Sequence, residues 1–174
     1  MNIFHDNLNR LASRNQDLAA AVKSVVGGVL TIEPARTGVP SARRSGRWIH
    51  SAYDPLREAQ TWAATHAATC QAGEMVVVAG VGLLYHVEAL RKTLSPEVAL
   101  AVLVPNLDEF HDALAARPLE SWSEAIVWLS GAPDECTKTL TKTGRPIRSL
   151  SYAPAVAWDT DFHHALEEAL RRDM

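Results

Sequence analysis

The sequence predicts an α/β fold: a Rossmann-like, doubly wound parallel sheet that follows an N-terminal appendage of helices and a β-hairpin. Two observations lead to this prediction. From about residue 75 onward, short apolar segments alternate with stretches of helical periodicity. The apolar segments carry few polar residues, which is typical of strands in a parallel sheet covered by helices on both faces. Before residue 51, by contrast, extended stretches follow one another with only a glycine turn between them.

The N-terminal appendage is expected to span residues 1–50. Apolar residues between positions 4 and 11 recur at helical spacing. Asn15 is a favourable N-cap for a second helix, which should end at Gly27-Gly28. Two extended stretches then flank Thr37-Gly38, so they predict a small antiparallel hairpin or meander.

The Rossmann-like domain is expected to span residues 51–174. Asp54 is a good N-cap and Pro55 suits the first helical position, so a helix should begin there. Strands and helices alternate after this helix, and a final helix should begin near Asp159. The parallel strands are predicted at residues 75–79, 98–103, 124–129 and 147–151.

Composition excludes several classes of function. The net charge of −3 and the pI near 6.1 provide no broad basic surface, so nucleic acid is not an expected partner. Cys70 and Cys136 are too few for a disulfide framework, and they fit a reducing compartment. No apolar run approaches the roughly 20 residues of a membrane span, and the N-terminus lacks the apolar region of a signal peptide. We therefore expect a cytoplasmic protein with no membrane partner.

The segment VVVAGVGLLYH, residues 76–86, contains the strongest candidate for a ligand site. A buried strand runs into Gly80 and Gly82 and then into a helix, and this is where parallel sheets bind nucleotides. A complete dinucleotide fingerprint has a third small residue, but that position falls on Tyr85. Tyr85 and His86 begin the helix and are candidates for contact with a base or phosphate, although packing and surface roles are commoner for such residues.

The end of the second strand gives weaker support for nucleotide binding. An acidic residue usually binds the ribose there, but the sequence has Val104. Asn106 is a candidate substitute that would supply one hydrogen bond. The simpler interpretation is that Asn106 caps the next helix together with Glu109, three residues later.

Three segments occur in a characteristic order and spacing: HSAYDPLREA (residues 50–59), VVVAGVGLLYHVEAL (76–90) and LAVLVPNLDEFHDAL (100–114). Together they resemble the N-terminal domain of the motility-associated factor family, bacterial flagellin glycosyltransferases. The resemblance implies a Rossmann-like domain that accompanies a transferase, with flagellin or a downstream transferase domain as partner. Transferase activity in that family is attributed to a separate downstream domain, so the resemblance does not imply sugar transfer by this chain.

Two positions depart from the pattern of that family. A glycine and a glutamate are typical where this chain has Leu84 and Val104. Together these changes predict a degenerate nucleotide site. We therefore expect no firmly bound cofactor, with weak binding of a nucleotide or a CMP-sugar as the alternative.

Other polar groups have competing interpretations. Arginines of the hairpin could bind an anion or an acidic partner, or could prevent edge-to-edge pairing; they are Arg36, Arg43, Arg44 and Arg47. A group of polar residues suggests a catalytic site: His50, Ser51, Tyr53 and Asp54. However, Asp54 is already a good N-cap, and Ser51 lies in no glycine-flanked nucleophile elbow. His163 and His164 are adjacent, so they lack the i, i+4 spacing of a helical metal site.

The sequence favours a non-catalytic domain for recognition or assembly that carries a degenerate nucleotide site. No catalytic and no metal-binding residue is expected, and the oligomeric state stays open. Two alternative functions also stay open. One is an S-adenosylmethionine-dependent methyltransferase, since its first motif also places glycines after the first strand. The other is a module that binds a nucleotide sugar.

Overall fold

The computed structural model describes residues 2–173 and confirms the predicted fold class. Four strands form a parallel sheet in the order β6-β5-β4-β7. The strands are β4 (Met75–Ala79), β5 (Ala99–Leu103), β6 (Ile126–Leu129) and β7 (Ile147–Ser151). The third predicted strand began too early, because its first residues belong to the 3-10 helix η1 (Ser121–Ala125).

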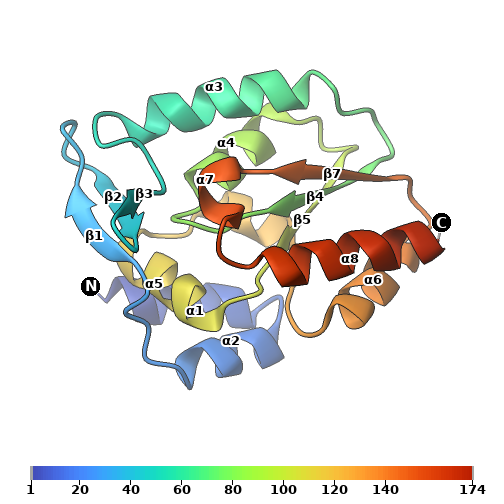
Figure 1. Ribbon diagram of the computed structural model, residues 1–174, viewed down its shortest axis with the longest axis horizontal. Coiled ribbons are helices and arrows are strands. Elements are labelled where there is room, and N and C mark those ends of the chain that lie inside the picture. Colours follow the sequence, from blue (N-terminus) through green and yellow to red (C-terminus); the bar gives the residue numbers. More distant parts are fainter. Residues whose placement is uncertain (1, 174) are drawn as a thin grey trace.

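Helices cover both faces of this sheet (Figure 1). On one face lie α3 (Pro55–Ala67), α4 (Tyr85–Thr93) and α5 (Leu107–Ala116); on the other lie α6 (Pro133–Thr141) and α8 (Thr160–Asp173). Successive residues of β4 alternate between the two buried clusters. Val76 and Val78 join the first cluster, whereas Met75 and Val77 join the second. This double burial is the reason that the strands read as continuous apolar runs.

The N-terminal residues form two helices and a separate antiparallel sheet. The elements are α1 (Ile3–Ala12), α2 (Gln16–Lys23), β1 (Thr31–Pro34), β2 (Pro40–Arg44) and β3 (Arg47–Trp48). The strands form a meander, β1-β2-β3, at the opposite end of the molecule from the C-terminus (Figure 1). Helices α1 and α2 pack against α5, and Leu8, Leu18 and Phe110 belong to one buried cluster. Residues on both sides of the boundary predicted at residue 50 thus share a hydrophobic core.

Local hydrogen bonds explain where several elements begin. The predicted caps are confirmed, because Asn15 Oδ1 accepts the Leu18 N–H at 3.0 Å and Asp54 Oδ1 accepts the Arg57 N–H at 3.1 Å. The turn that follows α2 is held by Asp112 of α5. The Asp112 carboxylate accepts the N–H groups of Gly28, Val29 and Leu30 at 2.7, 2.8 and 2.8 Å.

In the described part of the chain, every helix falls short of the length and apolarity that crossing a membrane requires.

Candidate functional site

The candidate site lies where the winding of the sheet reverses, which is the usual ligand position in such folds. From β4 the chain proceeds outward to β5 and β6, and it then returns to β7 on the other side of β4. The carboxyl ends of β4 and β7 therefore border the expected crevice. Gly80 follows β4, and Tyr152 follows β7 just before the short helix α7 (Ala153–Val156).

Protein atoms fill the space beside both glycines of the turn. A Cβ at Gly80 would lie 3.0 Å from the Tyr152 carbonyl oxygen and 3.1 Å from the Ala155 Cβ. A Cβ at Gly82 would lie 2.6 Å from His50 Nε2. Both glycines also have positive φ values, 106° and 50°, which side chains disfavour. The glycines are therefore required by the close approach of the chain to itself.

Side chains of the protein already bind the N–H groups that a phosphate would use. Gly82 donates its N–H to Glu109 Oε1 at 3.1 Å, and Leu83 donates its N–H to His50 Nε2 at 2.8 Å. A helix that begins after a glycine turn normally offers such N–H groups to an anionic ligand. Here the Glu109 carboxyl group takes the position of that anion.

Glu109 belongs to this closed site and not only to a helix cap. Its side chain is 2% exposed, and Oε2 lies 3.1 Å from Arg44 Nη1. The same Arg44 nitrogen lies 3.6 Å from Asp159 Oδ2. Burial raises the pKa of Glu109 to about 7, although Arg44 and the Gly82 N–H both favour the charged form. Arg44 therefore faces the crevice and does not contribute to an open anion-binding surface.

His50 connects the glycine turn to β7 and α3. Its Nε2 accepts the Leu83 N–H, and its Nδ1 lies 3.2 Å from the Tyr152 hydroxyl oxygen. That hydroxyl also lies 2.9 Å from Glu58 Oε1 and 2.9 Å from the Ile49 carbonyl oxygen. Burial lowers the pKa of His50, although Glu58 favours the charged form. Because Nε2 accepts a hydrogen bond, the single proton of the neutral ring belongs on Nδ1.

The residues around His50 form a tight connection and not a hydrolase triad. Ser51 Oγ accepts the N–H groups of Tyr53 and Asp54, both at 3.0 Å, and the Ser51 N–H donates to Glu58 Oε1 at 3.0 Å. Burial alone would raise the pKa of Glu58, but the nearby His50 ring and the hydrogen bonds from the Tyr152 hydroxyl and the Ser51 N–H outweigh burial and lower this pKa. The His50 ring and the Ser51 hydroxyl thus contact different partners, unlike the serine and histidine of a triad.

His86 is buried beneath Tyr152. The two rings stack with centroids 4.0 Å apart and planes 13° apart, and Trp62 meets His86 edge-on at 5.4 Å. His86 Nε2 lies 2.6 Å from the Gly80 carbonyl oxygen. Burial lowers the pKa of His86 to about 3, so the ring is neutral and donates Nε2–H to Gly80. His86 is therefore a buried packing residue beside the glycine turn, which was the commoner of its two interpretations.

Tyr85 and Asn106 also have structural partners. The Tyr85 hydroxyl donates to the Pro40 carbonyl oxygen at 2.6 Å, and the Arg117 guanidinium lies 3.6 Å from the centre of the Tyr85 ring. Tyr85 therefore ties α4 to the meander. Asn106 Oδ1 accepts the Glu109 N–H at 3.0 Å, which confirms the interpretation of Asn106 as a cap for α5.

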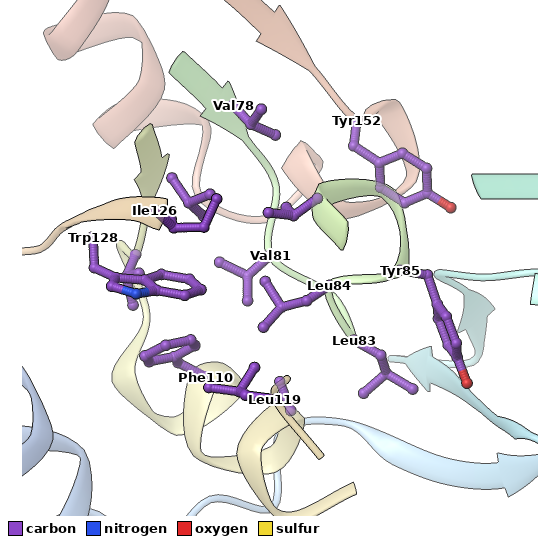
Figure 2. Close-up of a cluster of buried hydrophobic side chains, with 14 of the residues drawn as sticks. Val78, Val81, Leu83, Leu84, Tyr85, Phe110, Leu119, Ile126, Trp128 and Tyr152 are labelled. Atoms are coloured by element: carbon purple, nitrogen blue, oxygen red, sulfur yellow. The ribbon is translucent and has the colours of Figure 1, made fainter. Parts of the chain in front are cut away.

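Both residues that depart from the family pattern are buried. Leu84 is 1% exposed and Val104 is 2% exposed. Leu84 has a φ of 67° and a ψ of 10°, a left-handed conformation that favours glycine. Figure 2 shows its side chain pointing toward Val81 and Phe110. The leucine thus accepts an unfavourable backbone conformation and places its side chain in the hydrophobic core.

The four arginines of the meander have different environments. Arg43 forms an ion pair with Glu33 and lies over the Trp48 ring, 5.2 Å from its centre. Arg36 and Arg47 are exposed. Since Arg44 faces the crevice, the four residues do not form one continuous anion-binding surface. Arg36 and Arg47 keep the exposure that contact with a partner requires.

A solved structure with a related fold is the MAf glycosyltransferase from Magnetospirillum magneticum AMB-1, with a TM-score of 0.59 and 12% sequence identity. The similarity covers 100% of this chain and 36% of that chain, so this chain spans about a third of its length. A weaker similarity, with a TM-score of 0.36 and 15% identity, covers 78% of this chain and 59% of MNMC2 from Aquifex aeolicus. No protein-family model matches the sequence, and no curated protein is significantly similar to it.

Proposed function

We propose that this chain is a non-catalytic Rossmann-like domain for recognition or assembly, with a degenerate nucleotide site. The observation that carries this proposal is the occupation of the glycine turn by Glu109 and His50, which accept the N–H groups of Gly82 and Leu83. A nucleotide phosphate would have to replace these side chains. Losing one charge-assisted hydrogen bond costs about 1.5–3 kcal/mol, or roughly ten- to a hundredfold in affinity.

The setting of the domain is part of the same proposal. The sequence resemblance to flagellin glycosyltransferases and the fold shared with the MAf glycosyltransferase support a role beside a transferase. Flagellin or a transferase domain would then be the partner, in the cytoplasm. Since the similarity covers 36% of that protein, we assign to this chain recognition or assembly and not the activity of the whole enzyme.

The same geometry argues against the alternative functions. A methyltransferase normally binds the ribose of its cofactor with an acidic residue at the end of the second strand, and Val104 there is buried and apolar. The Tyr152 ring stacks on His86, and His86 hydrogen-bonds to the Gly80 carbonyl oxygen. Both rings therefore lie beside the turn, where S-adenosylmethionine or a nucleotide sugar would have to bind.

Calorimetric titration with S-adenosylmethionine, NAD and CMP tests the proposal. We expect none of them to bind with micromolar affinity. Micromolar binding of S-adenosylmethionine would overturn the proposal in favour of a methyltransferase, and binding of CMP alone would favour a nucleotide-sugar module. The double variant Leu84→Gly with Val104→Glu restores the residues typical of the family. If only this variant binds a nucleotide, the two substitutions account for the loss of the site.

A further inference from the structure

The outer edge of β6 forms the floor of a groove whose lining residues differ from those of the crevice. Within residues 2–173, β6 is the last strand on its side of the sheet, so only β5 pairs with it. A cavity of about 630 Å³ follows this edge. Residues 124–130 line its floor, while the start of α2 and the first turns of α6 line its walls.

The hydrogen bonds between β5 and β6 identify the backbone groups that face the groove. The Leu129 carbonyl oxygen accepts the Val104 N–H at 2.8 Å, and Leu129 lies opposite Leu103. Leu129 therefore directs its N–H and C=O toward β5. Because alternate residues of a strand face the same neighbour, Trp128 directs its N–H and C=O into the groove. The Trp128 indole lies in the core, 5.2 Å from the Phe110 ring, and anchors the strand.

The two edges of the sheet differ in how they are protected. β7 carries Arg148 and exposed serines at 149 and 151. β6 reads IVWL, without a charge or a proline, and Val127 is 38% exposed. Charged residues and prolines are the usual means by which edge strands avoid pairing with other chains. Of the two edges of the parallel sheet in residues 2–173, the β6 edge is therefore the one that offers an apolar and unprotected surface for an added strand.

The charges around the groove favour a basic partner. Glu124 lies just before β6, Glu135 lies in the first turn of α6, and Asp17 lies in the first turn of α2. Among the described residues that line the groove, Arg14 is the only Lys or Arg. Glu124 is paired with Arg10 at 3.1 Å, which leaves Asp17 and Glu135 for a ligand. A second copy would bring like charges together, whereas basic side chains would be attracted.

We propose that the groove along β6 binds an extended peptide segment with alternating apolar and basic residues, by strand addition. The segment hydrogen-bonds to the backbone of Trp128 and places an apolar side chain against Val127, on the face of the sheet that α6 covers. Because alternate side chains of a strand point to opposite faces, its basic side chains point to the α2 face, toward Asp17. This inference rests on the proposed recognition role and specifies the surface that performs it.

A titration followed by NMR tests the inference. The probe is a synthetic peptide of alternating valine and lysine residues, and the matched control replaces each lysine with glutamate. We expect only the lysine peptide to shift the resonances of residues 124–130 and to slow amide exchange at Trp128 about tenfold. Unchanged exchange at Trp128, or equal binding of the two peptides, would overturn the inference.

Variants on the two edge strands provide the matched control within the protein. Val127→Lys should weaken binding of the lysine peptide about tenfold, whereas Ser149→Lys on β7 should leave it unchanged. Asp17→Asn changes an exposed charge and should also weaken binding, so the test does not depend on one variant folding. Equal affinity in the Val127, Asp17 and Ser149 variants would place the peptide elsewhere.

Two further outcomes separate this inference from the proposed function. If neither the nucleotides nor the peptide bind, the β6 surface is wrong while the closed glycine turn stands. If a nucleotide binds with micromolar affinity, the proposed function fails whatever the peptide does. Dimers in sedimentation experiments that disappear in Val127→Lys would show a second copy, and not a basic peptide, on the β6 edge.

Discussion

The crevice beside the glycine turn and the groove along β6 differ in what occupies them. Both lie at positions where parallel sheets offer backbone hydrogen-bonding groups to a partner. In the crevice, side chains of the protein accept the N–H groups of Gly82 and Leu83, and the Tyr152 and His86 rings fill the neighbouring space. In the groove, about 630 Å³ of open volume borders the outward-facing backbone of Trp128.

The difference follows from the cost of leaving a backbone group without a partner. Buried N–H groups need hydrogen bonds, and at the glycine turn the protein supplies them from Glu109 and His50. At the β6 edge, water can satisfy the same kind of group until a partner arrives. A ligand in the crevice must therefore compete with buried side chains, whereas a strand at the edge displaces only water.

The largest effect should come from opening the crevice at Tyr152. Tyr152→Ala leaves a cavity beside Gly80 and His86 and removes the hydroxyl from His50 and Glu58, so the free energy of unfolding should fall by about 3–5 kcal/mol. Tyr152→Phe keeps the packing and loses only the hydrogen bonds, at a cost of about 1–3 kcal/mol. Urea denaturation measures both. Equal losses in the two variants would show that the ring does not fill the crevice.

Acid should destabilise the closed crevice through His86. The pKa of His86 is about 3 in the folded protein, against an ordinary value of 6.5, so between these values only the unfolded chain binds the proton. The stability that depends on neutral His86 is therefore complete above pH 6.5. It is lost at about 1.4 kcal/mol per pH unit as the pH falls toward 3.

The contribution of Glu109 to stability changes with pH in the opposite direction, so a variant of His86 is needed to isolate the contribution of the histidine. Its folded pKa of about 7 lies above the ordinary 4.5, so its contribution is complete below pH 4.5 and is lost as the pH rises through 7. His86→Gln keeps this contribution and removes that of His86. Between pH 7 and pH 4.5 the parent protein should lose about 2–3 kcal/mol relative to the variant, as measured by urea denaturation. The same change of unfolding free energy in the parent protein and in His86→Gln would show that His86 titrates near its ordinary pKa.

The sequence predicted the fold and the position of the crevice because both depend on local patterns. Strand burial appears as apolar runs, and the caps at Asn15, Asp54 and Asn106 act over three residues. The closure of the crevice depends on distant residues. Gly82 and Glu109 are 27 positions apart, and Leu83 and His50 are 33 positions apart.

Periodicity does not reveal which distant side chain reaches a turn, so three members of the closed site were missed. Glu109 was identified only as a partner in a helix cap, and Glu58 and Tyr152 were not identified at all. The available signal was indirect: Leu84 and Val104 stand where a nucleotide site usually has a small residue and an acidic residue. The groove along β6 left a weaker signal, namely a strand of four apolar residues without a protecting charge.

The backbone conformation at Leu84 should reverse the usual order of stability between an alanine variant and a glycine variant. Leu84→Ala and Leu84→Gly both remove a buried side chain, which costs about 2–5 kcal/mol. Within a helix alanine is more stable than glycine, but Leu84 lies just before α4, where a φ of 67° penalises every residue with a Cβ. We therefore expect the glycine variant to be more stable than the alanine variant by about 1 kcal/mol in thermal or urea unfolding. The opposite order would show that the turn relaxes when the leucine is removed.

The smallest effect on stability should come from the open edge. Val127 is 38% exposed and its backbone pairs with β5, so Val127→Lys keeps the ladder and extends the new charge into the groove. The free energy of unfolding should change by no more than about 0.5 kcal/mol, as for Ser149→Lys. Because a lysine opposes pairing between edges, the Val127 variant should also aggregate less at high protein concentration. A loss above about 2 kcal/mol would mean that Val127 is packed like a core residue. The β6 groove would then be closed like the crevice, and the contrast between the two regions would not hold.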